Sequence, residues 1–192
     1  MRKACLLRWG LGALLAAAIP ISHVITYAQS GGGSARAVQA TVVTPLGLNT
    51  TMLSDTGTLN SPTDARDASL SSGSVGSLLI AQTLHATAIG STDQIAAEAS
   101  LAGLSLSIAG TSVTADFVQA RATSGTRGVR TSTVDELAIN GVPIDVSGDA
   151  NQTISIPGGA VVINEQNGNA VKALHIVING VADVVIASAS AQ

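Results

Sequence analysis

The chain has 192 residues, of which 46% are hydrophobic, 11% are charged and only 2% are aromatic, and its formal net charge is −3. The acidic balance argues against nucleic acid as a partner, and the high aliphatic content excludes a disordered tail. Cys5 is the only cysteine, which excludes a framework of internal disulfides.

The N-terminal stretch MRKACLLRWGLGALLAAAIPISHVITYA has the layout of a secretory signal peptide. Basic residues come before an apolar run from Leu11 to Ile19, and small residues follow at Thr26 and Ala28. This order predicts export and cleavage after Ala28, so that residues 1–28 are the signal peptide. The run is too short for a membrane anchor, and we expect no membrane span in the mature chain. Six basic residues against twelve acidic ones then remain, a net charge of about −6.

Residues 29–36, which include SGGGS, are predicted to form a flexible linker, and residues 37–192 a single all-β domain. Alternating segments separated by Gly, Asn, Asp and Pro indicate many short antiparallel strands, and LSLSIAG, at Leu104–Gly110, is the clearest of them. The other predicted strands are Ala37–Thr44, Leu78–Ile89, Val113–Ala122, Val134–Ile139, Thr153–Ile156, Ala160–Asn164, Val171–Ile178 and Asp183–Ser188.

The segments between these strands carry loop signals. Residues 61–74 are predicted to be a polar loop and residues 124–132 a second, basic loop. The stretch STDQIAAEASLAG starts like a capped helix at Ser91, but the serine alternation that follows Gly103 favours a strand for its second half.

The tetrapeptide INGV occurs at Ile139–Val142 and again at Ile178–Val181. Asn-Gly is the strongest short hairpin signal, because a type I′ turn needs positive φ at both central residues. Successive strands with turn signals and no covering helices favour an antiparallel two-sheet β-sandwich, with a β-solenoid as the alternative.

Five motifs follow one another in the second half of the chain. They are SVTADFVQARATS, STVDELAINGVPIDV, NQTISIPGGAVVINEQ, VKALHIVI and ADVVIASASA. In this order and spacing they resemble the choice-of-anchor P family of exported bacterial proteins, from about Val75 to the C-terminus. The resemblance implies an exported domain and no particular reaction. Members carry differing C-terminal surface-anchoring signals, and the sequence departs from that pattern in ending at Gln192 without one.

Sequence motifs for nucleotide binding, zinc hydrolysis and serine hydrolysis are absent. A Ser-His-Asp triad would depend on His85 or His175. His85 lies on the polar side of its strand and is predicted to be a solvated residue. His175 shares a face with Val171 and Ala173, and is predicted to be a partly buried structural histidine. We therefore expect no catalytic residues and no cofactor.

Glu165 with Asp183 or Asp135 could supply the two carboxylates of a glycosidase. The scarcity of aromatic residues argues against a sugar cleft, so Glu165 is interpreted as the polar end of a strand that enters the turn NEQNGN. An enzymatic function depends on whether Glu165, His175 and Asp183 converge in space.

The stretch DVSGDAN places Asp145, Asp149 and Asn151 in one loop, where their oxygen atoms could bind Ca²⁺. The spacing does not match an EF-hand. Because Asp, Gly and Asn also form ordinary tight turns, a turn is the favoured interpretation, and we expect no metal.

Lys172 is the only lysine outside the predicted signal peptide. It alternates with Leu174, Ile176 and Ile178, so its stem is expected along the apolar face. This placement makes Lys172 a candidate for a Lys–Asn isopeptide cross-link, although a lysine that snorkels from the end of a strand is the favoured interpretation.

These features predict an exported, non-enzymatic structural or interaction protein of the cell surface, the extracellular matrix or the periplasm. Its expected partners are envelope or matrix polymers or further copies of itself, contacted through exposed strand edges. The first alternative is a ligand-binding module that depends on a glycan or on Ca²⁺, and the second is a glycosidase-like hydrolase.

Overall fold

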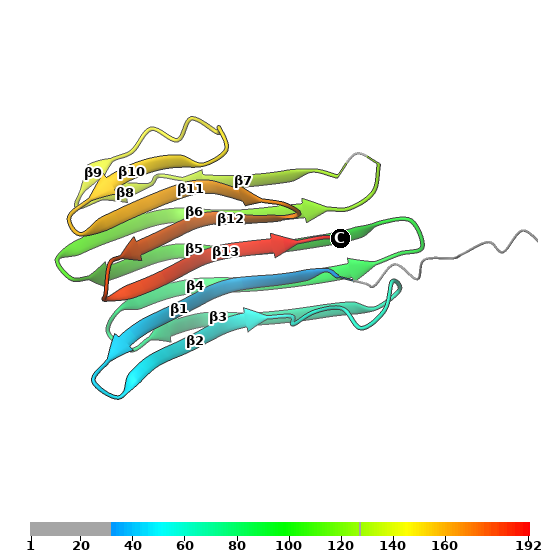
Figure 1. Ribbon diagram of the computed structural model, residues 1–192, viewed down its shortest axis with the longest axis horizontal. Helices are drawn as coiled ribbons and strands as arrows, with labels where there is room; N and C mark the ends of the chain where they lie inside the picture. Colours follow the sequence, from blue (N-terminus) through cyan, green and yellow to red (C-terminus); the bar gives the residue numbers. More distant parts are fainter. Residues whose placement is uncertain (1–31, 127) are drawn as a thin grey trace, which may run out of the picture.

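A computed structural model describes residues 32–126 and 128–192, and the regular structure of these residues consists of β-strands alone (Figure 1). The predicted signal peptide and residues 29–31 of the predicted linker lie outside the described residues. The strands are β1 (Ser34–Thr44), β2 (Gly47–Asp55), β3 (Ala65–Val75), β4 (Leu79–Gly90), β5 (Ile95–Ile108), β6 (Thr111–Thr123), β7 (Arg130–Asp135), β8 (Ala138–Ile139), β9 (Val142–Pro143), β10 (Gln152–Ile156), β11 (Gly159–Asn167), β12 (Ala170–Ile178) and β13 (Ala182–Ser190).

The strands form two antiparallel sheets that face each other. The first sheet has the order β10-β11-β12-β13-β1-β2, and the second has the order β3-β4-β5-β6-β8-β9, with β7 also paired to β6. Strand β13 packs over β5 and β6, and β1 packs over β4 and β5. The predicted two-sheet β-sandwich is therefore confirmed, and the solenoid alternative was wrong.

The core between the sheets is aliphatic and rich in alanine. Alternate residues of the long strands point inward, as the period of two in the sequence requires. Each large aliphatic side chain that is fully buried contributes roughly 1.5–3 kcal/mol. The largest of them are Leu79, Leu84, Ile95, Leu101, Leu106, Ile163, Leu174, Ile176 and Ile186, and small alanines such as Ala81, Ala86, Ala99 and Ala120 fill the space between them.

Three predicted boundaries are corrected at the edges of the sandwich. Strand β1 begins at Ser34, so the last residues of the predicted linker already belong to the sheet. The predicted polar loop 61–74 is mostly strand β3, and strand β7 begins inside the predicted loop 124–132. Strand β3 lies at the edge of its sheet and is largely exposed, so its sequence ARDASLSSGSV has no apolar alternation to reveal it.

The ambiguous segment after Ser91 is also resolved by the structure. It enters β5 at Ile95, and this strand continues without a break in secondary structure to Ile108. The preference for a strand in its second half is confirmed, and the strand also includes residues 95–97 of the first half.

The two INGV turns differ in conformation. At the first, Asn140 and Gly141 have φ values of 52° and 77°, which confirms the type I′ prediction. At the second, Gly180 has a φ of 70° while Asn179 is not left-handed, and the N–H of Val181 donates to the carbonyl of Ile178 at 2.9 Å. A positive φ at the third residue alone is the pattern of a type II turn, so type I′ was wrong there.

A line of irregular residues crosses the first sheet, and we call it the bulge line. Each member is left out of the pairing between neighbouring strands, although the residues before and after it are paired. Several members have a positive φ. The register is the same on both sides of the line, so no strand carries an extra residue. Across the line the alternation of inward and outward side chains is inverted, so that two successive residues of a strand point into the core. The members of the bulge line are Ser54 on β2, Ala37 on β1, Ala187 on β13, Ala173 on β12 and Asn164 on β11.

Candidate functional site

Four ionisable side chains meet on the outer face of the first sheet, and we call them the Glu165 cluster. Glu165 lies on β11, Lys172 and His175 lie on β12, and Asp183 lies at the start of β13. The three strands are neighbours in the sheet. Glu165, His175 and Asp183 therefore do converge, which the sequence left open.

The bulge line is the reason why Lys172 and His175 lie together. Strict alternation places residues three apart in a strand on opposite faces, and the sequence accordingly predicted different faces for the two. In the structure Ala173 and Leu174 are both fully buried, which turns Lys172 and His175 to the same outer face. The expectation that the Lys172 stem follows the apolar face was wrong for this reason.

The side chains of the cluster are joined by short polar contacts. Lys172 Nζ donates to Glu165 Oε1 and Oε2, each at 3.2 Å, and lies 3.4 Å from His175 Nδ1. His175 Nδ1 is hydrogen bonded to Glu165 Oε2, and His175 Nε2 lies 3.1 Å from Asp183 Oδ1. The His175 side chain is only 14% exposed, so it is partly buried as predicted. The shared face was wrong, because Val171 and Ala173 point into the core and His175 lies on the outer face.

Both ring nitrogens of His175 face carboxylates. A neutral imidazole carries one N–H and donates to one carboxylate at a time, whereas the imidazolium donates to both. With an imidazolium at His175, the cluster holds two carboxylates, Glu165 and Asp183, and two cations, Lys172 and His175. The pKa of Glu165 is lowered from its ordinary value: partial burial raises it, but the hydrogen bond from Lys172 and the charges of His175 and Lys172 together lower it further.

This geometry favours a structural role over a catalytic one. A Ser-His-Asp triad needs one imidazole nitrogen on the nucleophile, but here the two nitrogens hold Glu165 and Asp183. A glycosidase needs two carboxylates across a space that admits the sugar, whereas the ring of His175 lies between these two. Asp135, the other predicted carboxylate, belongs to β7 in the second sheet. The cluster ties three adjacent strands together.

The contacts that the structure gives for the amine of Lys172 do not include an asparagine. In the described part of the chain, its Nζ contacts Glu165 and His175. Asn164 precedes Glu165 but is buried, and its side-chain amide donates to the carbonyl of Gly148 at 3.1 Å. The cross-link candidate therefore has an ion pair with a carboxylate in place of the amide acceptor that a Lys–Asn bond requires.

The predicted calcium loop is held by hydrogen bonds of its own. The side-chain oxygen of Asn151 accepts the N–H of Gln166 at 3.0 Å, and the carbonyl of Asp145 accepts the side-chain amide of Gln152 at 2.7 Å. The N–H of Asp149 donates to a neighbouring serine hydroxyl. Within residues 32–126 and 128–192, no three His, Cys, Asp or Glu side chains are arranged to hold a metal ion.

The second histidine, His85, belongs to a separate and more exposed pair. Its Nε2 lies 2.7 Å from Asp67 Oδ1 across the β3–β4 ladder, in the second sheet. Because this pair is open to solvent, the geometry agrees with the solvated histidine that was predicted.

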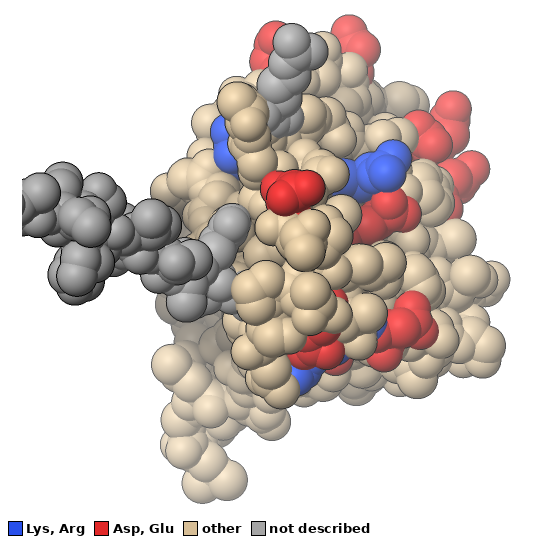
Figure 2. All heavy atoms as spheres, turned by 90° about the vertical axis from the view of Figure 1, so that its right-hand side faces the viewer, with Lys and Arg blue, Asp and Glu red and all other residues tan. Residues whose placement is uncertain are grey.

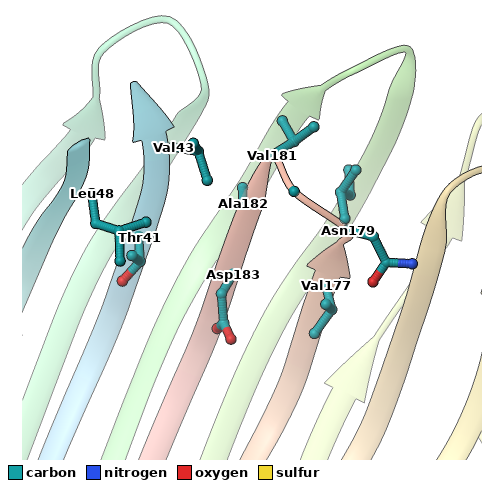
Figure 3. A pocket seen from close by; sticks show the side chains of 10 residues that line it. Thr41, Val43, Leu48, Val177, Asn179, Val181, Ala182 and Asp183 are labelled. Carbon is teal, nitrogen blue, oxygen red and sulfur yellow. The ribbon is translucent and has the colours of Figure 1, made fainter. Parts of the chain in front are cut away.

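Two shallow hollows adjoin the Glu165 cluster and share Asp183. The first, of about 350 Å³, is lined by side chains from β1, β2, β12, β13 and the turn after β12, with Val43, Leu48 and Val181 around it (Figure 3). The second, of about 380 Å³, lies over β13, whose small Ser188 and Ser190 stand between longer side chains on β12 and β1.

The strand edge next to the first hollow is the most exposed apolar feature on this side. Leu48 is 74% and Met52 is 48% exposed on β2, and Leu46 at the tip of the β1–β2 hairpin is fully exposed. Sequence reasoning missed β2 altogether, since GLNTTMLSD shows no clean alternation. In Figure 1 this strand and β3 lie side by side along one edge of the sandwich.

Charge is sparse on the surface. The end of the molecule that faces the viewer in Figure 2 is mostly neither acidic nor basic, and acidic side chains outnumber basic ones there. Most basic side chains with described contacts are already paired: Arg36 with Asp55, and Arg121 with Glu98. Arg127, one of the arginines of the predicted basic loop, lies outside the described residues.

Comparisons of the chain with protein-family models, with curated proteins and with solved structures found no match. In the part of the chain that the structure describes, no helix is long and apolar enough to span a membrane.

Proposed function

We propose that this protein is an exported, non-enzymatic structural or interaction module of the cell surface, the extracellular matrix or the periplasm. Its working parts are the edges of its sheets, through which it contacts further β-structure or envelope and matrix polymers. Membership of the choice-of-anchor P family, suggested by the motif order from Val75 onward, is part of this proposal.

The observation that carries the proposal is the unguarded edge strand β2. Natural proteins commonly protect sheet edges with lysine, proline or very short strands, because a free edge pairs with other chains. Strand β2 is nine residues long, and its only charged residue is Asp55 at its last position. An edge of this kind is suited to β-strand addition, in which backbone hydrogen bonds supply the affinity.

The Glu165 cluster also supports a structural function, because its contacts stabilise the first sheet. Its histidine is held between two carboxylates, and the network bridges β11, β12 and β13. Cross-strand ion pairs and hydrogen bonds stabilise a sheet, so the polar residues that resemble a catalytic constellation in sequence are accounted for by a stabilising role.

Export and attachment can be tested together. We would express the full chain in a bacterial host and follow it by cell fractionation, by intact mass and by co-sedimentation with envelope and matrix material. We expect a chain that starts at residue 29, recovered from the exported fractions and bound to that material or self-associated. An uncleaved chain that stays in the cytoplasm would overturn the proposal.

A hydrolase test separates this proposal from the enzymatic alternative. We expect no turnover of glycoside substrates by the purified protein. Turnover that is lost in both Glu165→Gln and His175→Ala would contradict the proposal, because it would assign chemistry to the Glu165 cluster. The far-UV circular dichroism of both variants serves as the control for folding.

A further inference from the structure

We propose that two copies of this chain pair through β2 in an antiparallel manner, about a two-fold axis at Thr50, and so join their first sheets into one continuous sheet. The inference rests on the proposed function and deepens it, since it names a second copy of the chain as the partner of the β2 edge.

The first step is to establish which backbone groups of β2 are free. The N–H of Val43 donates to the carbonyl of Val181 at 2.9 Å, so every second residue of β1, counted from Val43, turns its backbone groups toward β13. The residues between them face β2, where the register pairs them with Asn49 and Thr51. In an antiparallel ladder the remaining alternate residues of β2 direct N–H and C=O outward.

These outward residues are Leu48, Thr50 and Met52, and they are self-complementary. Antiparallel pairing about Thr50 brings Leu48 opposite Met52 of the partner subunit, and Thr50 opposite Thr50 of the partner subunit. All three side chains lie on the outer face, as the contact of Thr50 Oγ1 with Thr41 Oγ1 at 2.9 Å shows for the central one. The pairing covers two apolar side chains that are exposed in the single copy, and such cross-strand pairs stabilise a ladder.

Charge and length distinguish β2 from the other sheet edges. The stretch GLNTTMLS contains no charged residue and no proline, so two copies meet without repulsion. Strand β3 carries Arg66 and Asp67, β10 has only five residues, and β9 has two residues, one of them Pro143. Charges, short length and proline discourage edge pairing. Strands β3, β10 and β9 each have one of these features, and the stretch GLNTTMLS of β2 has none of them.

The expected dimer is reversible. One strand pair forms a small interface, at the low end of the range for specific complexes. Sedimentation velocity of the full chain over a concentration series should therefore show a monomer–dimer equilibrium. A chain that stays monomeric at every concentration would overturn the proposal.

Charge substitutions test the position of the axis. Thr50→Lys places two lysines opposite each other and should weaken the dimer at least about tenfold. Thr153→Lys is the matched control, because Thr153 is exposed in the middle of β10, the other edge of the first sheet. It should leave the dimer unchanged. Equal weakening by both substitutions would indicate head-to-tail pairing and overturn the two-fold arrangement.

Cysteine cross-linking tests the register without relying on a charge change. In a Cys5→Ser background, Thr50→Cys introduces the sole thiol, and it should form a disulfide-linked dimer under mild oxidation, since directly opposite residues lie within disulfide reach. Asn49→Cys points its thiol to the other face and should cross-link less. A stronger cross-link from Asn49→Cys would contradict the register. Circular dichroism confirms the fold of each variant.

The two proposals fail separately. A strictly monomeric protein that is exported and binds envelope material refutes the β2 dimer alone. A dimer that is never exported refutes the proposed function and leaves the pairing in place.

Discussion

Replacement of Glu165 by glutamine should weaken the sandwich in a pH-dependent way. The substitution removes the charge that faces Lys172 and His175, while its amide oxygen still accepts one hydrogen bond. Hydrogen bonds to charged groups contribute about 1.5–3 kcal/mol and exposed ion pairs about 0.2–1 kcal/mol. Because Glu165 is 23% exposed, we expect an intermediate loss of about 1–2 kcal/mol at pH 7, which corresponds to a Tm lowered by roughly 2–8 °C.

The sign of the pH dependence follows from the lowered pKa of Glu165. The charged carboxylate contributes its stability above its ordinary pKa of 4.5, and this contribution is lost as the pH falls through the lower pKa of the folded state. The Tm difference between the wild type and Glu165→Gln should therefore be full at pH 7, should shrink as the pH falls below 4.5, and should vanish once the pH lies below the lowered pKa of the folded state.

Thermal unfolding followed by far-UV circular dichroism is the suitable assay, because Phe117 is the only aromatic residue among those described. The matched control is Glu98→Gln: Glu98 is paired with Arg121 at 2.9 Å, but that arginine is 62% exposed, so we expect a loss of about 0.5 kcal/mol or less. Equal losses in the two variants at pH 7, or a difference for Glu165→Gln that does not shrink as the pH falls below 4.5, would refute the stabilising role of the cluster.

Leu174→Ala should cost about 2–5 kcal/mol in chemical denaturation, because Leu174 is fully buried in the core; a loss under about 1 kcal/mol would contradict tight packing at the bulge line. Ala109→Gly should raise the stability by roughly 0.5–1 kcal/mol, since Ala109 has a φ of 49° in its turn, and a lower Tm would count against that conformation. The intact mass should show no loss of ammonia or water, because Lys172 is held by a carboxylate ion pair with Glu165; a loss of either would indicate a cross-link. Added Ca²⁺ should leave the Tm unchanged, since the side-chain oxygen of Asn151 and the carbonyl of Asp145 already accept hydrogen bonds within this region, and a marked rise would restore the calcium-dependent alternative.

The all-β class and the positions of the inner strands could be predicted from the sequence. Residues such as Leu104, Leu106 and Ile108 alternate with serine because one face of their strand is buried and the other is not. Asn140 and Gly141 mark a turn because they adopt left-handed conformations at low cost. Both signals are local, so one sequence was enough to find them.

The edge strands could not be predicted in the same way. Strands β2 and β3 bury few of their side chains, so burial leaves almost no period in their sequences. They are strands because β1 and β4 offer them a ladder of backbone hydrogen bonds. The reason that these segments are strands is therefore the neighbouring strand, and the amino-acid sequence of the segment itself does not show it.

The Glu165 cluster was found only in part, and the bulge line explains the difference. The sequence marked Glu165, His175 and Asp183, but alternation separated Lys172 from His175. Asparagine at position 164 is a residue type that tolerates a positive φ. Alanine at position 187, which is also left-handed, gives no such signal in a single sequence.

The bulge line has a mechanical consequence for the sandwich. The bulge-line residues of β2, β13 and β11 have a positive φ. They lie opposite the bulge-line residues of β1 and β12, which are likewise left out of the pairing between strands. A strand that slides along its neighbour moves its irregular residue out of this row, and it also turns buried side chains toward water when the slip is by one residue. We therefore expect a slip between neighbouring strands of the first sheet to be opposed by the alignment of these irregular residues as well as by the hydrogen bonds of the ladder.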